Sequence, residues 1–258
     1  MKYNLKLFFI NIITILFISS CSSDDNNEAN QVANATSQIC PEIIGPTAIY
    51  WDVLNGFPAT QLTQIPTIQN LGGFFAHSTF PGLGFSFPVG YSANEINPGQ
   101  SNLVGVNVTR DDNRAIWRNI LGLSLSGNFM ASDLIESEIN DLLGFLGVPN
   151  TNFTVICSED TFDPNNGIGQ LSFSSRLIQF DEFTSEIALR VQFSPAINMS
   201  FLSLFTSASP TVEFDASVLD VFLPIYFQLL VVDEDVRDSD LDGTPDNQDN
   251  FPFDPTRQ

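Results

Sequence analysis

Basic residues are scarce in this chain, and histidine occurs once. The 258 residues include 30 acidic and 9 basic side chains, for a formal net charge of −21 at pH 7. Both lysines, Lys2 and Lys6, lie at the extreme N-terminus. A chain of this charge repels nucleic acid, so we expect no nucleic-acid partner. Schiff-base and lysine-base chemistry are excluded downstream of Lys6, and the single His77 excludes a zinc site built from several imidazoles.

Motifs of the common enzyme classes are missing as well. The sequence has no G-x-S-x-G nucleophile elbow and no phosphate-binding glycine loop before a predicted helix. His77 is therefore interpreted as a loop or core residue beside Phe75. So many carboxylates place some pair close together by chance, and Asp181, Glu182 and Glu186 receive no catalytic role. We assign no catalytic residue, and an enzyme is the less favoured class.

Three arginines form the one basic cluster. Arg110, Arg114 and Arg118 flank the pair Asp111-Asp112. A guanidinium fork suits a carboxylate or sulfate group, so the cluster is a candidate site for recognising such a ligand. The alternative, which we favour, is local pairing of arginine with aspartate on an exposed turn.

The N-terminus has the anatomy of a secretory signal over residues 1–20. Two lysines precede a nearly unbroken apolar run, residues 7–18, which is too short to span a bilayer as a mature helix. Ile18-Ser19-Ser20-Cys21 then resembles the lipobox of bacterial lipoproteins. That resemblance implies that cleavage leaves Cys21 as the first residue and that its thiol carries lipid. An ordinary signal peptide followed by an unrelated cysteine is the alternative.

A polar stretch, residues 21–38, follows the signal. It has almost no large apolar side chains, so we predict a disordered tether. The acidic cluster that begins at Asp24 is similar to the surface-export signal of Bacteroidetes lipoproteins. This similarity implies a lipid-anchored protein of the outer membrane that faces the cell surface. Because the chain is acidic, we expect the lipid, not surface charge, to hold it at the membrane.

Cysteine occurs three times. With Cys21 assigned to lipid, Cys40 and Cys157 remain in an oxidising compartment, and we predict a disulfide between them. Two buried free thiols are the alternative, because the sequence does not give the distance between the two residues.

Residues 39–232 are predicted to form one β-rich domain. Apolar and polar residues alternate with period two in several segments, which is typical of antiparallel strands with one buried face. These segments are Val104–Val108, Phe153–Cys157, Ile187–Phe193 and Val212–Ala216. The mostly apolar residues 218–232 predict a central strand or pair of strands, interrupted at Pro224. The expected fold class is mainly β, an antiparallel β-sandwich-like domain with one clear α-helix.

That helix is predicted between Asp133 and Leu146. Asp133 is the expected N-cap, an apolar stripe follows it, and Gly147 with Pro149 ends the helix. For residues 110–122, a hairpin that turns at the aspartates is favoured over a short helix. Phenylalanine outnumbers tyrosine by 24 to 4, which favours core packing over a sugar-stacking platform.

The C-terminal residues 233–258 carry the strongest chemical signal. From Asp238 the chain has oxygen ligands at loop positions one, three and five, a glycine at six and a carboxylate at twelve, as a calcium loop requires. The segment resembles one thrombospondin type 3 repeat, in its bacterial form with phenylalanine in place of cysteine. The predicted calcium ligands are Asp238, Asp240, Asp242, Thr244, Asp246 and Asp249. We expect a structural metal, and a disordered acidic tail is the alternative.

Together these features predict a surface-exposed lipoprotein that acts as a non-enzymatic binding or adhesion module with structural calcium. Its expected partners are the membrane, through the lipid, and a polysaccharide or protein ligand. A hydrolase that acts on polysaccharide and a structural subunit of an outer-membrane complex are the alternatives. An exposed aromatic patch would favour the binding module, a groove lined by paired carboxylates the hydrolase, and an unpaired apolar edge strand the subunit.

Overall fold

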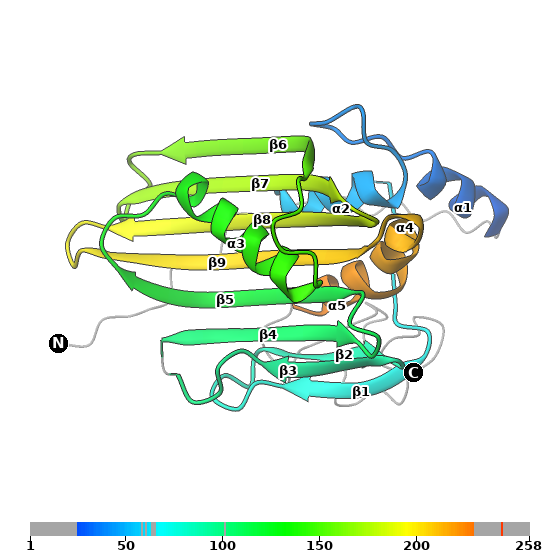
Figure 1. Cartoon of the computed structure of the whole chain (residues 1–258), viewed down its shortest axis with the longest axis horizontal. Helices are drawn as coiled ribbons and strands as arrows, with labels where there is room; N and C mark the ends of the chain where they lie inside the picture. The colour runs from blue at the N-terminus through cyan, green and yellow to red at the C-terminus, as the bar shows by residue number, and fades with distance from the viewer. Residues whose placement is uncertain are drawn as a thin grey trace.

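The structure, a computed structural model, describes residues 25–57, 59, 61–62, 66–100, 102–229 and 244. Its main element is a seven-stranded antiparallel sheet in the order β3-β4-β5-β9-β8-β7-β6 (Figure 1). The strands are β3 (Tyr91–Glu95), β4 (Leu103–Arg110), β5 (Ile116–Ser126), β6 (Thr154–Asp163), β7 (Gln170–Phe180), β8 (Phe183–Ser194) and β9 (Met199–Pro210). A separate two-stranded sheet consists of β1 (Leu71–Ala76) and β2 (Gly84–Pro88).

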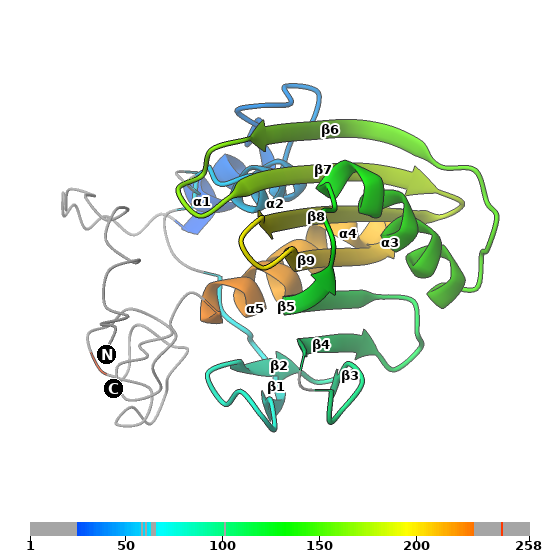
Figure 2. The ribbon, with the colours of Figure 1, turned by 90° about the vertical axis from the view of Figure 1, so that its left-hand side faces the viewer.

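Helices lie on both sides of the large sheet. They are α1 (Asp25–Ala33), α2 (Pro46–Leu54), α3 (Ala131–Phe145), the 3-10 turn η1 (Thr211–Glu213), α4 (Phe214–Ser217), the π-helical turn η2 (Val218–Phe222) and α5 (Leu223–Gln228). Figure 2 shows α3 on one side of the sheet and α2 and α5 on the other. None of the helices among the described residues is long and apolar enough to cross a membrane.

The chain builds the large sheet from two runs of neighbouring strands. β3, β4 and β5 follow one another in space as in sequence, and so do β6, β7, β8 and β9. α3 connects β5 to the far edge strand β6, and β9 then pairs with β5 and joins the two runs. Every pairing is antiparallel. The mainly β, sandwich-like fold expected from the alternating pattern is confirmed.

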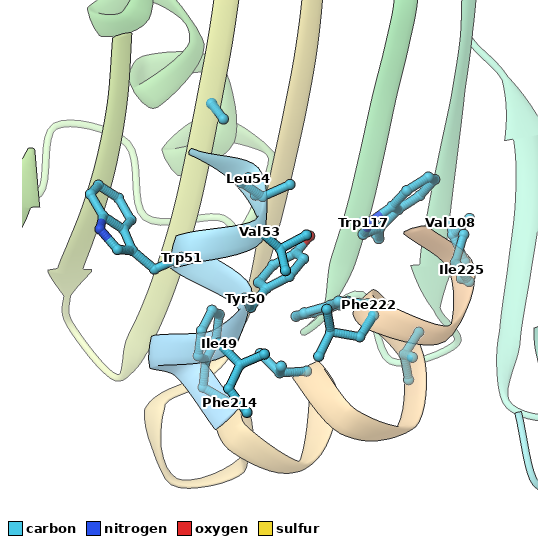
Figure 3. Close-up of a cluster of buried hydrophobic side chains, with 14 of the residues drawn as sticks. Ile49, Tyr50, Trp51, Val53, Leu54, Val108, Trp117, Phe214, Phe222 and Ile225 are labelled. Carbon is cyan, nitrogen blue, oxygen red and sulfur yellow. The ribbon is translucent and has the colours of Figure 1, made fainter. Parts of the chain in front are cut away.

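Alternation along β8 separates two cores. Ile187 and Leu189 belong to the core under α3, whereas Ala188 belongs to the core on the opposite face. In this second core, shown in Figure 3, Tyr50 of α2 meets Phe222 of η2, with 6.0 Å between their ring centroids. One strand thus supplies both layers, because successive side chains point to opposite faces.

Helix α3 begins two residues before the predicted cap at Asp133. Met130 occupies the N-cap position, and the N–H of Ala131 donates to Ser172 Oγ of β7 at 2.9 Å. The cap is therefore supplied by the sheet, and Asp133 lies in the first turn, where its charge suits the helix dipole. The predicted end is confirmed, since the helix stops at Phe145 and Gly147 has φ of 76°.

Residues 211–228 are helical, so the strands predicted for Val212–Ala216 and, over its described part, for residues 218–232 are wrong. Buried side chains recur at helical spacing and form one face of η2 and α5: Val218, Val221, Phe222 and Ile225. Pro224 lies at the start of α5, directly after the π-helical turn η2. A continuous apolar run has no clear period, so it does not separate a buried strand from a buried helix.

The described part of the N-terminal segment packs on the domain around Val32 and Ser37, which corrects the tether predicted for residues 21–38 over that part. α1 lies within it, and the side chains of Val32 and Ser37 are buried. Ser37 Oγ donates to Asp52 of α2 at 2.6 Å. A small number of apolar side chains and one buried carboxylate hold this segment, although its composition is that of a disordered chain.

Candidate binding surface

The predicted disulfide between Cys40 and Cys157 is present. The two Cα atoms lie 6.5 Å apart, and the bond joins residues 117 positions apart in sequence. It ties the segment before α2 to the edge strand β6, and Cys40 is buried. Both sulfurs are used in the bond, so the neighbouring Glu42 does not complete a metal site with them.

The predicted lipid and calcium sites fall almost entirely outside the described residues. Cys21 lies outside them, and so do all but one of the predicted calcium ligands, namely Asp238, Asp240, Asp242, Asp246 and Asp249. The exception is Thr244, which is partly buried. These assignments therefore stay predictions from the sequence.

The arginine cluster is neutralised by carboxylates. Arg110 contacts Asp112 at 2.9 Å and Glu213 at 2.7 Å, and Arg114 contacts Glu182 at 2.8 Å. Hydrogen bonding to the Arg110 guanidinium lowers the pKa of Asp112. The predicted hairpin is confirmed, since β4 and β5 pair on either side of this turn. The cluster is the local ion pairing favoured above, not an anion-binding site.

The third arginine of the cluster, Arg118, and the more distant Arg176 are also paired. Arg118 donates to Glu138 of α3 at 2.8 Å, and Thr206 donates to the same carboxylate at 2.7 Å. Burial raises the pKa of Glu138, which the charge of Arg118 opposes. Arg176 binds Asp160 on the neighbouring strand β6. Arg190 is the one described arginine that forms no ion pair with the described carboxylates.

His77 is a buried residue beside Phe75, as interpreted from the sequence. Its ring and that of Phe75 meet edge to face with 6.5 Å between centroids, and Nδ1 lies 3.3 Å from the Thr79 hydroxyl. A buried imidazole beside an aromatic ring and a threonine has a packing role here.

Glu186 on β8 is fully buried, and neither of its carboxylate oxygens has a hydrogen-bond partner. Burial raises its pKa well above the ordinary range, and the negative charge of Asp52 raises it further. Burial, and then the charge of Glu186, likewise raise the pKa of Tyr50. The fold therefore favours the neutral acid. Without solvent exposure, this carboxyl has no contact with a ligand at the surface.

An open pocket of about 200 Å³ lies near the disulfide. Ile43 and Ile156 line it, together with Thr47 and Asp215. The Thr47 hydroxyl donates to Asp215 at 2.6 Å, so these two polar groups already satisfy each other. We assign no site to this pocket.

Helix α2 covers only part of its face of the large sheet, and the described helices leave another part of that face uncovered. α2 ends at Leu54, and the Ser175 hydroxyl of β7 donates to the next residue, Asn55, at 2.7 Å. Figure 1 shows α2, α4 and α5 gathered behind one end of the large sheet. Beyond Ser175 on this face come two rows of cross-strand partners: Phe173, Arg190 and Ser203, then Leu171, Gln192 and Phe201. We call these six residues the open face.

The open face combines aromatic and polar side chains. Phe201 is 43% exposed, Arg190 is exposed, and the other four residues are partly buried. Phe205 and Tyr226, with 5.4 Å between their ring centroids, pack at its border. Residues directly opposite on antiparallel strands share a face, so these groups form one continuous surface. The alternating pattern of Ile187–Phe193 predicts a position on the solvated face for Arg190. Nothing in the sequence indicates at which residue α2 ceases to cover this face.

The edge strand β6 does not have the properties of an open pairing edge. The strand carries acidic residues as well as exposed apolar ones, and the acidic side chains disfavour addition of a strand from another chain. The apolar residues are Val155, Ile156 and Phe162, and the acidic ones are Glu159, Asp160 and Asp163.

The chain matches no protein-family model, and no curated protein is significantly similar to it. Its function is therefore argued from its own residues.

Proposed function

We propose that this protein is a lipid-anchored binding module of the outer bacterial surface, and that the open face holds a polysaccharide ligand. The supporting observation is an exposed aromatic residue, Phe201, on a face that also presents Gln192 and Ser203. Exposed aromatic patches on soluble domains are typical of interaction sites. Flat rings pack against the flat faces of sugars, while amide and hydroxyl groups exchange hydrogen bonds with sugar hydroxyls.

Replacement of Phe201 tests this function. We expect Phe201→Ala to weaken polysaccharide binding about fivefold to tenfold, because a buried aromatic anchor in an interface contributes roughly 1 kcal/mol or more. The measurement is a glycan array, followed by calorimetry, on the soluble chain from Ser22 onward. Val212→Ala is the matched control, since Val212 is 94% exposed and lies on η1, away from the open face. Equal binding by both variants and the wild type would remove the open face from the proposal.

The membrane anchor is supported by the signal and the lipobox-like tetrad. We expect labelled fatty acid to enter the wild-type protein in a bacterial host, and Cys21→Ser to leave the protein unlabelled. A labelled serine variant would contradict lipidation at Cys21.

The calcium loop is supported by its ligand spacing and by the absence of lysine near it. We expect calcium at one hundred times its dissociation constant to stabilise the chain by about 2.7 kcal/mol, because the metal binds the folded form. Titration calorimetry and thermal unfolding, with and without chelator, measure this effect. Asp242→Asn should abolish it, whereas the control Asp220→Asn, on an exposed residue of η2, should not. Absence of calcium heat in the wild type would refute the loop assignment.

A further inference from the structure

Arg190 differs from the other arginines of the described domain. Arg110, Arg114, Arg118 and Arg176 each lie within 3.0 Å of a carboxylate oxygen. Arg190 is exposed and forms no such pair within the described part of the chain. On a protein with a net charge of −21, carboxylates are abundant. An arginine left without one, on a surface that already has the exposed ring of Phe201, offers its charge to an external ligand.

The surroundings of Arg190 suit recognition of an anionic group. Phe173 and Ser203 flank it on the neighbouring strands. Tyr226 lies close enough for the charge of Arg190 to oppose the rise in the pKa of Tyr226 that burial causes. The guanidinium is a planar fork of N–H donors, which can donate two hydrogen bonds to the oxygens of a carboxylate or sulfate group.

The neighbouring polar groups add directionality. Gln192 lies one row further along β8, and its amide nitrogen donates to the carbonyl of Gln170 at 3.0 Å. This bond orients the Gln192 side chain. Arg190 and Gln192 follow one another along β8, and Phe201 lies opposite Gln192 on β9. The open face therefore presents a cation, an oriented amide and an aromatic ring next to one another, which suits contact with several sugar units.

We propose that the open face binds a polysaccharide that carries carboxylate or sulfate groups, and that Arg190 recognises the anionic group. The inference rests on the proposed function, because it names the ligand class of the same surface. The acidic protein repels such a polymer at long range, but salt screens this repulsion beyond about 8 Å. At contact distance, Arg190 is the one arginine of the described domain that forms no ion pair with a described carboxylate.

The test compares polymers that differ only in charge. The soluble chain from Ser22 onward is titrated with polygalacturonate and with its methyl ester, and separately with a sulfated galactan and its desulfated form. We expect at least tenfold tighter binding of one acidic polymer than of its neutral counterpart. Whether the carboxylated or the sulfated pair shows this preference identifies the anionic group.

Variants then assign the preference to a residue. Arg190→Ala should remove the preference for the charged polymer, and Arg190→Lys should keep part of it. Arg114→Ala is the matched control, because Arg114 is exposed but is paired with Glu182. Circular dichroism of each variant confirms that it is folded.

Any of three other results would overturn the inference. Equal affinity for charged and neutral polymers, with sensitivity to Phe201→Ala retained, would refute the role of Arg190 and keep the proposed function. Failure of every polymer to bind would refute both. The remaining candidate occupant is a second copy of the chain, and sedimentation of the protein without ligand tests it. Self-association that Arg190→Ala abolishes would assign the open face to this second copy.

Discussion

Loss of the Cys40–Cys157 disulfide is expected to lower the free energy of unfolding by about 4 kcal/mol, because the bond closes a long loop in the unfolded chain. It links residues 117 positions apart and ties the N-terminal segment to β6. For a chain of this length, the loss corresponds to a melting temperature lower by roughly 10 °C. Urea unfolding of the oxidised wild type and of the double variant Cys40→Ser, Cys157→Ser measures the free energy, and thermal unfolding measures the melting temperature.

The reduced wild type is the control for this prediction. It should match the double serine variant, since both lack the cross-link and retain the same backbone. A difference of less than about 1 kcal/mol between oxidised and reduced protein would show that packing of Val32 and the bond from Ser37 to Asp52 hold the N-terminal segment without help.

Replacement of Glu186 by glutamine is expected to change how stability depends on pH. Burial raises the folded-state pKa of Glu186. At pH values above the ordinary carboxyl pKa, the folded protein therefore keeps a proton on Glu186 that the unfolded chain has released. The wild type therefore loses about 1.4 kcal/mol of stability per pH unit from this group, between its unfolded and folded pKa values. Glutamine carries no such proton. Over this pH range, the free energy of unfolding of Glu186→Gln should therefore rise relative to that of the wild type by about 1.4 kcal/mol per pH unit.

Urea unfolding at several pH values from 5 to 8 measures this difference. The full contribution of the neutral acid is present below its unfolded pKa and disappears as pH rises through the folded pKa, so the two curves should diverge toward alkaline pH. Glu182→Gln is the control, because Glu182 is an exposed neighbour in a surface ion pair with Arg114. Parallel curves for Glu186→Gln and the wild type would show that the carboxyl is ionised and compensated in the folded state.

Local patterns in the sequence predicted several strands and one helix. The alternation of Ile187–Phe193 identified β8, and the apolar stripe after Asp133 identified α3. The disulfide followed from the number of cysteines and an oxidising compartment. These features depend on neighbours in sequence or on composition, so they can be derived without knowing which elements touch.

Elements buried on all sides gave no such pattern. Every residue of α2 from Ala48 to Leu54 is buried, so its apolar positions show no helical period. The apolar run 218–232 predicts a strand, whereas its described part is helical, because a continuous apolar run does not separate a buried strand from a buried helix. The cap of α3 also comes from Ser172, which is distant in sequence.

The sequence alone determines the acidity of the chain and predicts the features of its two ends: the secretory signal, the lipobox-like cysteine and the calcium loop. Only the tertiary structure decided that Glu186 is buried and that Arg190 forms no ion pair with the described carboxylates. Glu186 and Arg190 lie four residues apart on one face of β8, yet one is fully buried and the other exposed. The difference arises because α2 covers the first position and ends before the second, and burial depends on contacts between elements that the local sequence does not encode.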